Sequence, residues 1–78
     1  IETALTKQLV AFVQTLRTLD LRKSPSISET VDWARALILL HADTLEPDMA
    51  RDTLNVLLKF EQDIEAVEPQ VAELLRQP

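Results

Sequence analysis

The residues of this chain that could carry out chemistry are few. His41 and Asp43 lie close together, and the serines Ser24, Ser26 and Ser28 lie upstream, so the residue types of a hydrolytic triad are all present. No nucleophile-elbow motif surrounds any of these serines, and the chain has no glycine with which to build one. The sequence therefore favours a capping or packing role for His41, and we assign no catalytic residue.

A cluster of acids, Glu61, Asp63, Glu65 and Glu68, raises the question of a cation site. A calcium loop of the EF-hand type alternates oxygen ligands around a central glycine, which this chain lacks. With no cysteine and one histidine, thiolate and multi-histidine metal sites are also excluded. We interpret the cluster as a solvated acidic face and assign no metal ligand.

Two cations, Arg22 and Lys23, come just before an expected helix start at Ser26. Cations beside a helix N-terminus favour an anion such as phosphate, although most such loops are simply solvated. Other polar residues at helical spacing are expected to be ordinary surface neighbours. These are Asp32 with Arg35, and Arg51 with Asp48 or Asn55.

Length and charge limit what the chain can be. Its 78 residues and 8.8 kDa allow one small domain, 1–78. A net charge of -5 argues against nucleic acid, which would require a basic face. The longest apolar run, 36–40, is too short to cross a membrane. No signal peptide is visible, and because the chain begins at Ile1 we expect a piece of a longer, cytoplasmic protein.

The elements that must position these residues are predicted to be four helices in an all-α bundle. The first, over about 3–18, has an apolar stripe that Val13 widens. It ends before Pro25, which disfavours a helical conformation at Ser24. The stripe consists of Leu5, Leu9, Phe12, Leu16 and Leu19.

The second helix, over about 27–41, has the strongest start signal. Ser26 and Glu29 have the spacing of a capping box. Apolar residues occupy two sides of this helix, which predicts that it is the most buried of the four. We favour a core position for Trp33 over a role as a partner's hot spot.

The third and fourth helices are predicted over about 47–60 and 65–76. Pro47 suits the first position of a helix. Pro69 leaves the start of the last helix open: either Glu68 caps a short helix, or the helix begins near Ile64 with Pro69 in its opening turns. We prefer the start at about 65.

The run 25–37 reads Pro-Ser-Ile-x-Glu-Thr-x-Asp-Trp-Ala-x-Ala-Leu. Together with the preceding residues 21–24 and the segments 12–17, 45–47 and 51–59, it resembles the C-terminal helical lid subdomain of MoxR-type AAA+ ATPases. Within that family the chain is most similar to the branch that includes the carbon monoxide dehydrogenase maturation ATPases. The resemblance covers about residues 10–60, and its most specific part is the run 25–37.

The resemblance implies a lid that packs on a nucleotide-binding core and on neighbouring subunits of a ring. ATP and Mg²⁺ would bind in the parent protein, which would act as a chaperone in protein maturation, often with a von Willebrand factor A domain partner. Such lids usually supply an arginine to the γ-phosphate at the start of the second helix. Residues 26–31 contain no arginine; Arg22, Lys23 and Arg35 flank them, so we carry over no nucleotide-binding residue.

A lid separated from its core would leave an apolar face bare. We expect that face to include the residues that widen each stripe, and to make the chain marginally stable or self-associating. The alternative is a free-standing module that binds a partner helix in a groove. The expected face comprises Phe12, Val13, Trp33, Leu40, Leu54 and Leu58.

Overall fold

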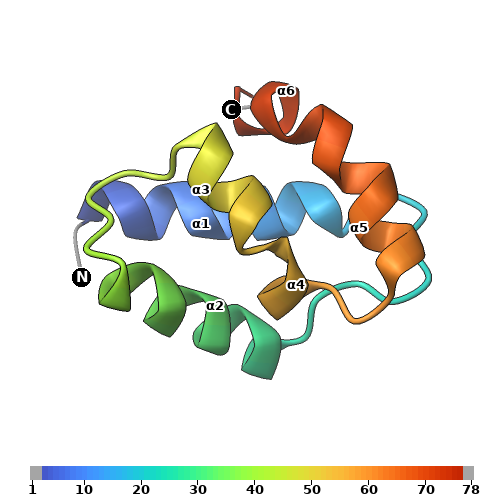
Figure 1. Ribbon diagram of the computed structural model, residues 1–78, viewed down its shortest axis with the longest axis horizontal. Coiled ribbons are helices and arrows are strands. Elements are labelled where there is room, and N and C mark those ends of the chain that lie inside the picture. Colours follow the sequence, from blue (N-terminus) through green and yellow to red (C-terminus); the bar gives the residue numbers. More distant parts are fainter. Residues whose placement is uncertain (1–2, 77–78) are drawn as a thin grey trace.

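The computed structural model describes residues 3–76. This part of the chain folds into six α-helices and one 3₁₀ turn, with no strand among its elements (Figure 1), so the predicted all-α class is confirmed. The elements are α1 (Thr3–Leu16), α2 (Ile27–Leu39), α3 (Pro47–Asp52), α4 (Leu54–Leu57), α5 (Glu61–Val67), η1 (Glu68–Gln70) and α6 (Val71–Leu75).

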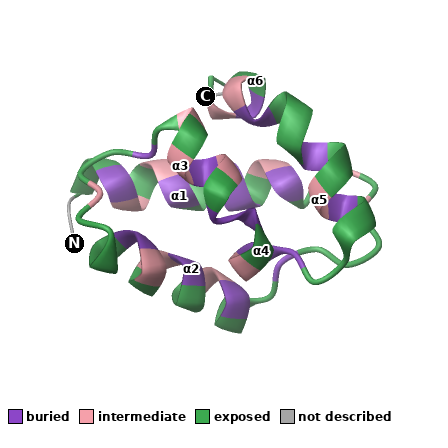
Figure 2. Ribbon diagram, viewed as in Figure 1, coloured by how far each residue is buried: buried purple, intermediate pink, exposed green. Residues whose placement is uncertain are grey.

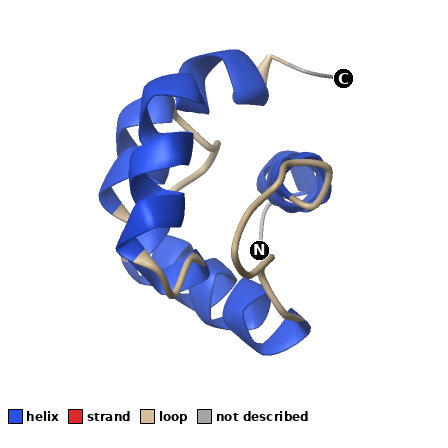
Figure 3. Cartoon of the chain, turned by 90° about the vertical axis from the view of Figure 1, so that its right-hand side faces the viewer, coloured by secondary structure: helices blue, strands red, loops and turns tan. Residues whose placement is uncertain are grey.

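The helices are arranged around α1. In Figure 1, α1 runs across the middle of the molecule, with α2 on one side and α5 and α6 on the other. α2 packs against α4, and both α1 and α3 pack against α6. Figure 3 shows α1 nearly end-on, with the other helices in an arc around it. One long side of α1 is therefore left uncovered.

The core forms around the predicted stripe of α1. Leu5, Leu9, Phe12 and Leu16 are buried at the helical spacing that the sequence shows (Figure 2). Trp33 from α2 is fully buried, with its ring centroid 5.5 Å from that of Phe12, so its predicted core position is confirmed. Aromatic rings at this separation add to the stability gained from burying their area.

The predicted helix 47–60 is wrong in its continuity and its end. Thr53 separates α3 from α4, and its hydroxyl accepts a 2.7 Å hydrogen bond from Trp33 Nε1. The same hydroxyl bonds the carbonyl of Met49 at 2.8 Å, a side-chain contact that competes with regular helix. Leu58 then turns extended, with φ of -110° and ψ of 129°.

The predicted helix 65–76 starts too late. α5 already begins at Glu61, where Glu61 and Asp63 place acids in the first turn, at the positive end of the helix dipole. Pro69 lies in η1, between α5 and α6. Because proline has no N–H for an i→i−4 bond, the α-helical ladder is interrupted there. Neither of the two starts left open by the sequence is observed.

The first two helices are close to their predicted bounds, 3–18 and 27–41, but each ends two residues earlier. The prediction that the second helix is the most buried is wrong. α2 buries only three residues, Glu29, Trp33 and Leu37, whereas α1 buries five. α2 lies at the edge of the molecule (Figure 2), so one of its two apolar sides faces outward.

Candidate functional site

Two regions of the surface could carry function. One is the charged junction, where the loop before α2 meets the link between α4 and α5. The other is the outward apolar side of α2 and the adjoining side of α1. The charged junction consists of Arg22, Lys23, Glu29, Lys59 and Asp63.

Glu29 is the centre of one part of the charged junction. The Ser26 hydroxyl accepts from the Glu29 N–H at 3.2 Å, and Glu29 Oε1 accepts from the Ser26 N–H at 2.9 Å. The predicted capping box is therefore confirmed. Lys23 Nζ lies 3.4 Å from Oε1 and Lys59 Nζ 3.5 Å from Oε2. Oε2 is buried and, among the described residues, has no hydrogen bond, so Lys59 compensates it by charge alone.

These contacts set the charge state of Glu29. The backbone N–H of Ser26 lowers the pKa of the Glu29 carboxyl most, and Lys23 lowers it further. Burial acts in the opposite direction, because it penalises the charged form. The net pKa lies below the ordinary value of 4.5, so the capping carboxylate is ionised at neutral pH.

Asp63 forms the other part of the charged junction, through contacts with residues distant in the sequence. Its Oδ1 accepts from the backbone N–H of Arg22 at 2.9 Å and its Oδ2 from that of Lys23 at 3.2 Å. The side chain is 3% exposed. A carboxylate that accepts two successive backbone N–H groups fixes the loop to the first turn of α5.

The Arg22 side chain continues this attachment. Its guanidinium lies 5.0 Å from the centroid of the Phe60 ring and donates to Gln62 Oε1 at 2.7 Å. The loop whose cations could favour an external anion or simply be solvated thus already receives two internal carboxylates, from Glu29 and Asp63. The interpretation of the acidic cluster needs a correction, because Asp63 is buried and bonded whereas Glu61, Glu65 and Glu68 are exposed.

The triad residue types are not brought together. Ser26 caps the start of α2, and His41 lies beyond its end, about 20 Å away at the rise of an α-helix. His41 has a φ of 59°, in the left-handed region. Its N–H bonds Ile38 O, and the next N–H, of Ala42, bonds Leu37 O, which is the Schellman pattern that ends a helix. His41 therefore caps the end of α2 through its backbone conformation.

The apolar surface differs from the one predicted. Of the six residues expected on a bare face, only Leu40 is exposed. The other five are buried, because α1, α2 and α4 turn their widened stripes toward one another. The large apolar side chains that are exposed instead lie mostly on α2 and its end. They are Ile27, Val31, Ile38, Leu39 and Leu40, with Val10 on α1 and Phe60 in the α4–α5 link.

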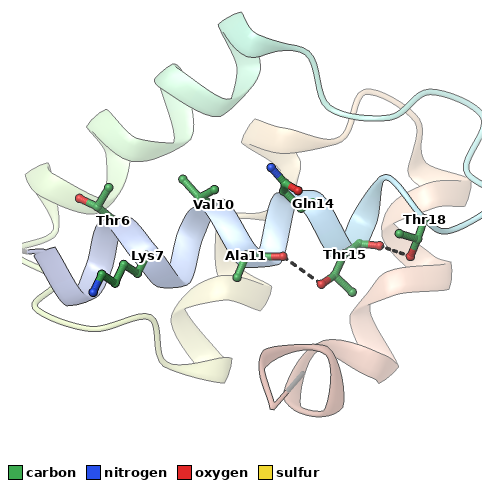
Figure 4. A pocket seen from close by; sticks show the side chains of 7 residues that line it. All are labelled: Thr6, Lys7, Val10, Ala11, Gln14, Thr15 and Thr18. Atoms are coloured by element: carbon green, nitrogen blue, oxygen red, sulfur yellow. Dashed lines mark hydrogen bonds between the residues drawn. The ribbon is translucent and has the colours of Figure 1, made fainter. Parts of the chain in front are cut away.

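Two hollows flank this surface. The smaller, of about 170 Å³, lies between α1 and α2 and is lined on its apolar sides by Val10, Val13, Ile27 and Val31. The broader one follows the uncovered side of α1, where Val10 and Gln14 lie along one edge of the helix (Figure 4). The Thr15 and Thr18 hydroxyls along it donate to backbone carbonyls of α1. This side of α1 holds no cluster of titratable groups.

Arg51 and Asp48 form an exposed ion pair at 2.7 Å. Within residues 3–76, no ion pair joins Asp32 to Arg35, no group of three or more potential metal-binding side chains occurs, and no helix has the length and apolarity to cross a membrane.

Comparison of the chain with protein-family models, with curated proteins and with solved structures yielded no match.

Proposed function

We propose that this chain is the helical lid subdomain of a MoxR-like AAA+ ATPase, similar to the carbon monoxide dehydrogenase maturation branch. The observation that carries the proposal is the run 25–37. Five of its residues have a role in building a helical subdomain: Pro25 is buried, Ser26 and Glu29 cap α2, and Trp33 and Leu37 enter the core. In this proposal, α3 with α4 and α5 with α6 correspond to the third and fourth helices of a four-helix lid.

The proposed lid contributes to nucleotide-dependent ring assembly and to chaperone-like protein maturation in the cytoplasm. It has no catalysis of its own, because phosphoryl transfer requires a phosphate cradle that a glycine-free chain does not form in the usual way. ATP and Mg²⁺ bind to the parent's core, which is the lid's partner together with neighbouring subunits and a von Willebrand factor A domain protein.

The flanking cations give no support for a direct contact with nucleotide. Arg22 and Lys23 already bind Gln62 and Glu29 through their side chains. Arg35 is exposed on α2, but it lies well beyond the start of the helix. The proposal therefore assigns the chain a packing role and no nucleotide ligand.

The test begins with the gene. A Walker A and a Walker B motif encoded upstream of Ile1 support the lid, and a self-contained reading frame of this length supports an interaction module. The second step compares the parent ATPase with a version truncated before this chain. Loss of ring assembly and of ATP turnover on truncation is expected. Full turnover and an unchanged ring without the chain would refute the proposal.

The alternative function, a free-standing helical interaction module, is favoured by one observation. Five large apolar side chains on α2 and its end are exposed, and contiguous exposed apolar patches mark interaction sites.

A further inference from the structure

A stripe of four apolar residues follows the outward side of α2. Ile27, Val31, Ala34 and Ile38 are spaced by 4, 3 and 4 residues, which places them on one side of the helix. Ile27 is 77% exposed, Val31 43% and Ile38 49%, and Ala34 is half-buried. Trp33 and Leu37, which enter the core, lie on a different side of α2. We call these four residues the α2 stripe.

The order of the α2 stripe is complementary to itself when reversed. In an antiparallel pair of helices, the 4-3-4 spacing lets Ile27 meet Ile38 of the second copy while Val31 meets Ala34. Each middle layer then combines a larger side chain with a smaller one, which lets the two backbones approach closely. Both outer layers combine two isoleucines. A two-fold axis generates every layer twice, as an isologous contact requires.

Two charged side chains beside the α2 stripe can pair across the same two-fold axis. Asp32 and Arg35 are exposed on one flank and form no ion pair with each other. The two-fold arrangement brings Arg35 toward Asp32 of the second copy, twice. In a parallel two-fold pair these flanks would lie on opposite sides of the interface, so only the antiparallel arrangement brings the two charges together.

The hollow between α1 and α2 lies at the Ile27 end of the stripe. Val10 and Val13 of α1 face Ile27 and Val31 of α2 across about 170 Å³. The antiparallel arrangement brings Ile38 of the second copy to this end. The hollow is also lined by Gln14, Arg17 and Thr30, but its four apolar side chains suit a branched aliphatic side chain, and α1 thereby adds to the contact.

We propose that the chain forms a two-fold symmetric dimer in which the α2 stripes pack antiparallel. The proposal is independent of the ATPase lid, because subunits of a ring contact each other head-to-tail and not about a two-fold axis. The contact involves one short helix and part of α1, which places the dimer among weak associations. Because each copy carries a net charge of -5, salt strengthens the dimer by screening the repulsion.

Sedimentation equilibrium of the whole chain tests the dimer, at about 10 μM to about 1 mM. We expect the mass to rise from 8.8 kDa toward twice that value. Ile38→Glu should weaken association at least about tenfold. Leu39→Glu is the matched control, because Leu39 is exposed beside the stripe but outside it, and it should associate like the parent chain. Circular dichroism confirms that both variants remain helical.

Disulfide trapping tests the orientation in a chain that has no cysteine of its own. Antiparallel packing places Ile27 opposite Ile38 of the second copy, whereas two Ile27 positions lie about 16 Å apart along the helix axis. Mixing Ile27→Cys with Ile38→Cys should therefore give a covalent dimer, and neither variant should do so alone. A chain that stays monomeric at the highest concentration, or variants that cross-link only with themselves, would overturn the proposal.

Discussion

The two ends of α2 are held by different means. Its start is fixed by the capping box of Ser26 and Glu29, by the two lysines around Glu29, and by the Asp63 carboxylate that holds the preceding loop. Its end relies on backbone hydrogen bonds of a Schellman motif, with His41 in a left-handed conformation. The start is therefore held by side chains, two of which, Lys59 and Asp63, are distant in sequence, and the end by local backbone geometry.

This difference predicts unequal stability along one helix. Breaking the start of α2 separates the loop from α4 and α5. Unwinding the residues after Leu37 exposes little that is now buried, because Ile38, Leu39 and Leu40 are already exposed. Local opening follows the elements with the fewest buried contacts. We therefore expect substitutions at the start to cost more than substitutions at the end.

The largest effect is expected for Asp63→Ala. The substitution leaves the N–H groups of Arg22 and Lys23 without their carboxylate acceptor in a partly buried loop, and unfolding in urea should show a loss of about 2–3 kcal/mol. Glu65→Ala is the control, because Glu65 is exposed on the same helix. Equal midpoints for the two variants would mean that the loop is not held by Asp63.

A smaller loss, about 1 kcal/mol, is expected for Ser26→Ala. The variant removes the hydroxyl that accepts from the Glu29 N–H at 3.2 Å but leaves the long-range contacts of Asp63 in place. Ser28→Ala, at an exposed position within the helix, should leave the urea midpoint nearly unchanged. The reverse ranking of the two serine variants would move the functional cap to Ser28.

The start of α2 could be predicted from the sequence because a capping box is local, with both partners three residues apart. The contacts of Asp63 could not, because its donor Arg22 is 41 residues away. The break at Thr53 escaped prediction for the same reason, since its hydroxyl serves Trp33, 20 residues earlier. Periodicity also could not decide which apolar side of α2 faces inward, and this is why the expected bare face was misplaced.

Acid should loosen the start of α2 specifically. The Glu29 pKa is lowered in the folded state, so the stability it contributes is present above its ordinary pKa of 4.5 and is lost as the pH falls through the lower, folded value. Glu29→Gln keeps an oxygen acceptor, now that of an amide, but does not titrate. The parent chain should be more stable than this variant at neutral pH, and the gap in urea midpoint should narrow below about pH 4.5. If the difference in urea midpoint stays constant as the pH falls below about 4.5, ionisation of Glu29 is not its source.

The smallest effect, and the only gain, is expected at the other end of α2. His41 is the one described non-glycine residue with positive φ, at 59°, a conformation that glycine adopts without steric cost. His41→Gly removes that cost but also loosens the unfolded chain, so the net stabilisation should be about 0.5 kcal/mol. Leu39→Gly, two residues earlier and inside the helix, should instead lose about 1 kcal/mol. Because both variants introduce the same residue into the same exposed end, opposite shifts of the thermal midpoint would isolate the backbone conformation of His41 as the cause. A lower thermal midpoint for His41→Gly would mean that the imidazole itself stabilises the end of α2. The two ends of α2 would then differ less than their hydrogen bonds indicate.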